Sequence, residues 1–79
     1  MPNQFPSLRA QQMLRVLRRL GYQEGRREGS HRRLVAGGRP ELTFAFHDRV
    51  TLPPGVVRSI LVRQVGLTVD EALEVVRRG

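Results

Sequence analysis

The chain has 79 residues, no cysteine and a formal net charge of +7, which fits one small domain and excludes disulfides and thiolate metal sites. All fourteen basic residues are arginine; nine lie within residues 1–39 beside two acidic residues, whereas residues 40–79 hold five of each. This one-sided basic charge points to a polyanion or an acidic protein partner. No apolar run approaches transmembrane length. A membrane surface is disfavoured as the partner because no helix combines a basic face with a wide, aromatic-rich apolar face.

Residues 1–6 are predicted to form a leader, and residues 7–79 a single domain. The leader lacks a basic region followed by an apolar one, so it is not a secretory signal. Ser7 is the predicted cap of a helix that stops at Gly21. Apolar residues recur along this helix at helical spacing: Ala10, Met13, Leu14, Leu17 and Leu20. Its other face carries arginines without acidic neighbours. Repulsion between these like charges slightly destabilises the helix, and the presence of this uncompensated charge favours a binding partner.

Three strands are predicted next, over residues 22–28, 31–35 and 41–47. Turns at residues 29–30 and 37–40 separate them, and a loop over residues 48–54 follows. Leu42, Phe44 and Phe46 alternate with smaller or polar residues, which is typical of a sheet with one buried face.

Two helices complete the chain. The first is predicted from about Pro54 to Val65 and ends at Gly66. The second begins at a capping box formed by Thr68 and Glu71. The whole order predicts an α+β fold with helices on one face of a three-stranded antiparallel sheet.

His31 is the candidate catalytic residue, because it follows the Gly29-Ser30 turn at the start of a strand. Histidine can take or give a proton near neutral pH. Strand alternation places His31, Arg33 and His47 on the open face of the sheet. No metal-ligand spacing or glycine-rich phosphate loop is present. RNA cleavage needs neither, since a base can activate the 2′-hydroxyl that DNA lacks.

Several sequence blocks occur in an order that is informative as a set. They are Leu-Gly-Tyr at 20–22, Gly-Ser-His at 29–31, Thr43 to His47, Leu52 to Leu61, and Val65 to Glu71. The chain thereby resembles the HicA toxins, also described as YcfA-like proteins, which are small ribonucleases of bacterial type II toxin–antitoxin systems.

The resemblance implies a double-stranded-RNA-binding-domain-like fold, α-β-β-β-α plus a C-terminal helix. It also implies ribosome-independent mRNA cleavage and neutralisation by a HicB-type antitoxin that covers the active site. The family's catalytic histidine falls on His31. Arg32 stands where many members have a second histidine, and Ala45 where many have proline.

The leading hypothesis is a cytoplasmic, metal-independent endoribonuclease without a cofactor, in which His31 is the general acid or base. Its predicted RNA contacts are Ser30, Arg32, Arg33, Arg15, Arg19 and His47. Two alternatives stay open. The chain could be a non-catalytic RNA-binding module, or an arginine-rich domain that binds an acidic protein.

Overall fold

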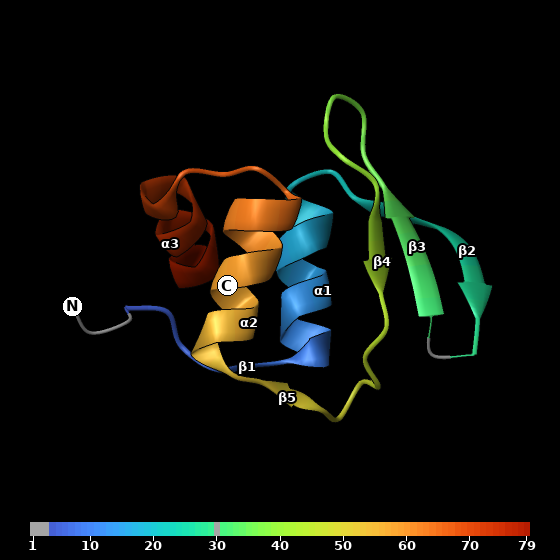
Figure 1. The fold of residues 1–79 in the computed structure, drawn as a ribbon, viewed down its shortest axis with the longest axis horizontal. Coiled ribbons are helices and arrows are strands. Elements are labelled where there is room, and N and C mark those ends of the chain that lie inside the picture. The colour runs from blue at the N-terminus through green and yellow to red at the C-terminus, as the bar shows by residue number, and fades with distance from the viewer. Residues whose placement is uncertain (1–3, 30) are drawn as a thin grey trace.

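A computed structural model describes residues 4–29 and 31–79, apart from the side chain of Arg26. The elements are β1 (Leu8–Arg9), α1 (Ala10–Arg19), β2 (Gln23–Glu28), β3 (His31–Val35), β4 (Leu42–Phe44), β5 (Thr51–Leu52), α2 (Pro54–Arg58), the π-helix η1 (Ser59–Gln64) and α3 (Val69–Arg78). The helices lie on one side of the antiparallel sheet β2-β3-β4 (Figure 1). The predicted fold, α-β-β-β-α with an added C-terminal helix, is confirmed.

Helix α1 packs its apolar stripe against the sheet and the later helices. Its fully buried residues include Met13 and Leu17, and Gly21 ends the helix with a φ of 102°, a conformation that glycine adopts without strain. Tyr22 follows, and its buried hydroxyl donates to the Pro40 carbonyl at 2.7 Å. Burial raises the pKa of Tyr22, so this hydroxyl keeps its proton as a donor.

The start of α1 differs from the prediction. Ser7 does not cap the helix, because Leu8 and Arg9 form strand β1, which pairs antiparallel with β5 through Leu8 opposite Leu52. The helix begins at Ala10, and the Gln12 side chain accepts from the Arg9 backbone N–H at 2.8 Å. A two-residue strand is too short to show alternation, so no periodic pattern in the sequence indicates this pair of strands.

The predicted C-terminal helices are both present. The first is not uniform, since α2 passes into η1, where the Val65 N–H donates to the Ile60 carbonyl at 2.9 Å, five residues back. The predicted capping box of α3 is confirmed: the Glu71 N–H donates to Thr68 Oγ1 at 3.1 Å, and the Thr68 N–H to Glu71 Oε1 at 2.9 Å. The hydrogen bond from the Thr68 backbone lowers the pKa of Glu71 most, and the hydrogen bond with the Thr68 side chain lowers it further.

Strand β4 is shorter than predicted. It spans only Leu42–Phe44, and the chain leaves the sheet before Phe46. The Phe46 ring still packs edge-on against Phe44, with ring centroids 5.2 Å apart. The alternating apolar pattern therefore continues to Phe46 because this ring packs against Phe44, although the hydrogen-bonded strand ends at Phe44.

A bulge in β2 decides which side chains share a face of the sheet. The β2–β3 register shifts between Glu24 and Arg26. Because a bulge adds one residue to one strand, Glu24 and Arg27 come to lie on the same face although three positions separate them. Their β3 partners Leu34 and Arg32 are both buried, so this is the face that carries the helices.

Candidate active site and basic surface

His31 lies on the outer face of the sheet, away from the helices. Strand β3 alternates exposed and buried residues from His31 to Val35, which confirms the predicted outward placement of His31 and Arg33. Together with Glu28, Arg32 and Thr43, these two residues line a hollow of about 250 Å³, which we call the outer hollow. Arg33 Nε forms an ion pair with Glu41 Oε1 at 2.8 Å, while the Arg33 side chain stays 60% exposed.

His47 lies elsewhere. It comes after the end of β4, so strand alternation does not govern its direction. It lines a second hollow together with Arg27, Gly29, Arg32, Phe46 and Asp48. The two histidines therefore line different hollows, and the structure does not bring them to a common one.

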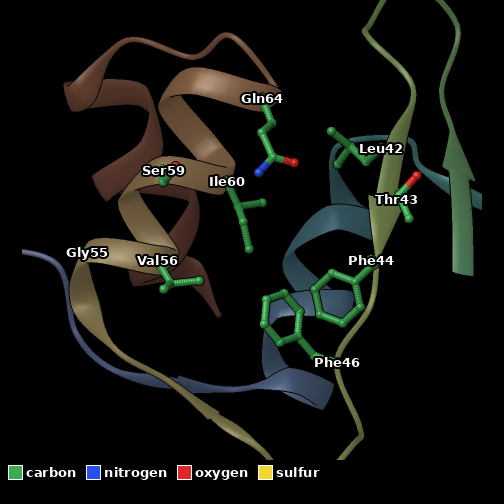
Figure 2. Close-up of a pocket in the computed structure, with 9 residues that line it drawn as sticks. All are labelled: Leu42, Thr43, Phe44, Phe46, Gly55, Val56, Ser59, Ile60 and Gln64. Carbon is green, nitrogen blue, oxygen red and sulfur yellow. The ribbon is translucent and has the colours of Figure 1, made fainter. Parts of the chain in front are cut away.

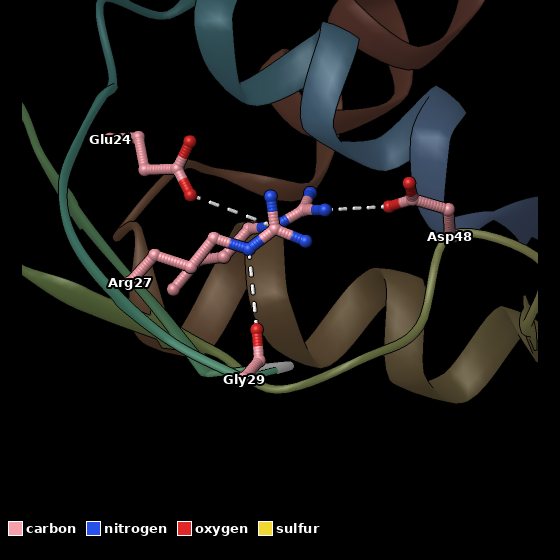
Figure 3. A network of polar contacts seen from close by, with 5 residues as sticks. Glu24, Arg27, Gly29 and Asp48 are labelled. Atoms are coloured by element: carbon pink, nitrogen blue, oxygen red, sulfur yellow. Dashed lines mark hydrogen bonds and ion pairs between the residues drawn. The ribbon is translucent and has the colours of Figure 1, made fainter.

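Arg32 is buried on the helix side of the sheet, with only 7% of its surface exposed. Its Nη2 donates to Asp48 Oδ1 at 2.8 Å, and its Nε lies 3.7 Å from Glu24 Oε1 (Figure 3). That Nε has no hydrogen-bond partner among the described residues. Arg32 is thus a structural cation held by two carboxylates, which differs from the exposed phosphate contact expected of it.

A third hollow, of about 330 Å³, opens between α1 and β2 beside this ion pair. Arginine dominates its lining, which consists of Gln11, Leu14, Arg15, Arg18, Glu24, Arg27, Arg32 and Asp48. We call it the basic hollow. Arg27 Nε donates to the Gly29 carbonyl at 3.2 Å (Figure 3). Within the described part of the chain, Arg15 and Arg18 have no carboxylate partner.

A family model described as the HicA toxin of bacterial toxin–antitoxin systems matches residues 10–67. The chain belongs to the HicA toxin family. Comparison with curated proteins and with solved structures gave no match. The matched residues run from α1 to Leu67, so they include all three hollows and leave out α3. Membership in the HicA family implies a toxin role and an antitoxin as partner.

The basic hollow of this HicA family member contains only part of the predicted RNA-binding set. Arg15 lines it, but Arg19 does not: Arg19 Nη1 donates to the Arg78 carbonyl at 3.1 Å, at the end of α3. Ser30 lies outside the described residues. Arg18 also lines the basic hollow but is not in the predicted set, although its i,i+3 spacing from Arg15 places both on one side of the helix. Arg27 was not identifiable, because its face depends on the bulge.

An apolar groove lies on another side of the HicA fold, between β4 and the α2–η1 helix (Figure 2). It is lined by Leu42, Thr43, Phe44, Phe46, Gly55, Val56, Ser59, Ile60 and Gln64. Figure 2 shows the Gln64 amide reaching into this groove from the helix. None of its side chains exchanges protons near neutral pH, so the groove is not a candidate centre for acid–base catalysis.

Residues 4–29 and 31–79 contain neither a cluster of metal-binding side chains nor a membrane-spanning helix. No three His, Asp or Glu side chains there gather closely enough to hold a metal ion. No helix in that part of the chain is long and apolar enough to cross a membrane.

Proposed function

We propose that this HicA family member is the toxin of a toxin–antitoxin pair and acts in the cytoplasm as a metal-independent endoribonuclease on mRNA. One observation carries the proposal: an exposed histidine, His31, shares the outer hollow with the exposed guanidinium of Arg33. Family membership supports the toxin role, and the chemistry of these side chains supports the choice of RNA.

The proposed reaction uses the substrate's own 2′-hydroxyl as the nucleophile. His31 transfers a proton during attack of this oxygen on the adjacent phosphorus. Arg33 stabilises the additional negative charge that develops on the phosphoryl oxygens. DNA carries no such hydroxyl, so the reaction is restricted to RNA.

Arg32 contributes to this reaction by positioning the strand. Its ion pairs with Glu24 and Asp48 join β3 to β2 and to the segment after β4. Since His31 is the neighbour of Arg32, these contacts fix the backbone from which the imidazole extends. Contact of Arg32 or His47 with RNA stays a prediction.

The basic hollow is the proposed site for the flanking RNA phosphates. Changing Arg15 and Arg18 to Glu should weaken RNA binding and flatten its salt dependence, by a slope of about 0.7 for each lost phosphate contact. The matched control changes Arg77 and Arg78 to Glu, on exposed α3. Equal weakening by both double variants, measured by titration at several salt concentrations, would show that the site of the charge does not matter.

The antitoxin is proposed to be a HicB-type protein that covers the same basic surface. Complementary charge accelerates association, so the Arg15→Glu, Arg18→Glu variant should bind the antitoxin more slowly, with the difference shrinking at high salt. RNA and antitoxin should compete for the free toxin. Simultaneous binding without loss of affinity would overturn occlusion and require inhibition from a distance.

Cleavage of RNA by the purified protein in EDTA tests the proposed activity. We expect cleavage to persist, since the reaction uses only side chains and the substrate hydroxyl. Cleavage that stops in EDTA and returns with Mg²⁺ or Zn²⁺ would contradict metal independence. Binding of RNA without cleavage in either condition would favour the alternative, a non-catalytic RNA-binding module.

A further inference from the structure

Glu28 is the direct cross-strand neighbour of His31. The β2–β3 register sets Glu28 opposite His31 at the end of the hairpin, and opposed residues of an antiparallel pair have Cβ atoms about 4.5–5.5 Å apart on one face. Both residues are exposed and both line the outer hollow. The bulge is essential to this placement, because without it Glu28 would face the helices.

Glu28 also lacks a structural role in the described part of the chain. The carboxylates of Glu24, Glu41, Asp48 and Glu74 are all engaged by arginines. Glu28 makes no ion pair or side-chain hydrogen bond with any described residue, although it lies in the most basic part of the molecule.

Cleavage by the 2′-hydroxyl requires two proton transfers at opposite ends of the reacting phosphate. One group removes the proton of the attacking oxygen, and another protonates the leaving oxygen. A single imidazole cannot occupy both places in one step. Among the other residues of the outer hollow, the Arg33 guanidinium offers no proton acceptor and Thr43 carries only a neutral hydroxyl. The Arg32 side chain lies on the opposite face of the sheet.

We propose that Glu28 is the second catalytic residue, the general base that works with His31 as general acid. This inference rests on the proposed ribonuclease function. A carboxylate near neutral pH accepts protons, whereas an imidazolium donates one, which assigns the two roles.

The Glu28 carboxylate takes the 2′-hydroxyl proton as the 2′-oxygen bonds to phosphorus. The bond from phosphorus to the 5′-oxygen breaks, and the His31 imidazolium protonates that oxygen. The products are a 2′,3′-cyclic phosphate and a 5′-hydroxyl, and water later restores the two protonation states.

The Glu28→Gln variant tests the assignment, because it keeps the shape and removes the base. We expect kcat to fall by about 10²-fold or more, with KM changed little and the acidic limb of the kcat–pH profile lost. Glu28→Asp keeps a carboxylate on a shorter side chain, so it should keep part of the acidic limb. Among the described side chains, the charged groups on the face of Glu28 are His31 and Arg33 of β3, with Glu41 paired to Arg33, and all remain in both variants. Glu74→Gln on α3 is the matched control.

The kcat of Glu28→Gln differs according to whether Glu28 is a general base or only a surface carboxylate. If Glu28 were only a surface carboxylate, its neutralisation would leave both kcat and the acidic limb of the kcat–pH profile unchanged. A Glu28→Gln variant as fast as Glu74→Gln, with the acidic limb intact, therefore overturns the assignment while wild-type cleavage still supports the ribonuclease. Absence of cleavage by the wild type would overturn both.

Discussion

Replacing His31 with Ala should reduce RNA cleavage by about 10²- to 10⁴-fold, the usual contribution of general acid–base catalysis. His31 is exposed at the start of β3 and contributes nothing to the core. The variant should therefore fold normally, with its free energy of unfolding within about 0.5 kcal/mol of the wild type. Single-turnover cleavage and a chemical denaturation curve together measure both quantities.

His47→Ala is the informative comparison for that variant. His47 lines a different hollow from His31, so its removal should raise KM through lost RNA contact and leave kcat nearly unchanged. A folded His31→Ala protein that cleaves at the wild-type rate would contradict the catalytic assignment. Equal loss of kcat in both variants would show that the reaction needs both histidines.

Replacing Asp48 with Ala should cause the largest loss of stability among the polar positions discussed. It removes the 2.8 Å acceptor of the buried Arg32 guanidinium and leaves only Glu24 at 3.7 Å. Breaking a fully buried ion pair costs about 3–5 kcal/mol. Since the Asp48 side chain is 44% exposed and water screens it, we expect about 1–3 kcal/mol.

Arg32→Met separates the cost of an unpaired charge from the cost of lost contacts. Methionine keeps much of the apolar stem and leaves the carboxylates of Glu24 and Asp48 in partial contact with water, so it should cost less than Asp48→Ala. Glu74→Ala removes an exposed pair on α3 and should change stability by less than about 1 kcal/mol. Urea unfolding of the three variants provides the comparison. If Arg32→Met is the most destabilising, the ion pairs of the guanidinium with Glu24 and Asp48 hold β3, and the cost of leaving a buried charge unpaired is the smaller effect.

The elements that the sequence predicted well are those with a strong periodic or capping signal. Leu34, as the apolar anchor of residues 31–35, predicted the two faces of that strand, and Thr68 with Glu71 predicted the start of α3. Elements built by distant pairing could not be found this way. Strand β1 exists because Leu8 meets Leu52, and neither two-residue segment carries a pattern of its own.

The candidate site was only partly predictable for the same reason. His31 and Arg33 followed from strand alternation. Glu28 and Arg27 depended on the β2 bulge, which a sequence with a single Gly25 indicates only weakly. Arg32 was predicted from its charge as an RNA contact, yet its burial depends on Asp48, which lies on a different segment.

The central claim, that this HicA family member cleaves RNA through the substrate's 2′-hydroxyl, is tested most directly on one mapped cleavage site. The purified protein is given that RNA in EDTA, alongside a copy with a single 2′-deoxy substitution at the nucleotide before the cut. We expect the unmodified RNA to yield a 2′,3′-cyclic phosphate and a 5′-hydroxyl, and the substituted copy to stay intact at that position. Cleavage of both RNAs at the same rate, or products with 3′-hydroxyl and 5′-phosphate ends, would contradict the mechanism.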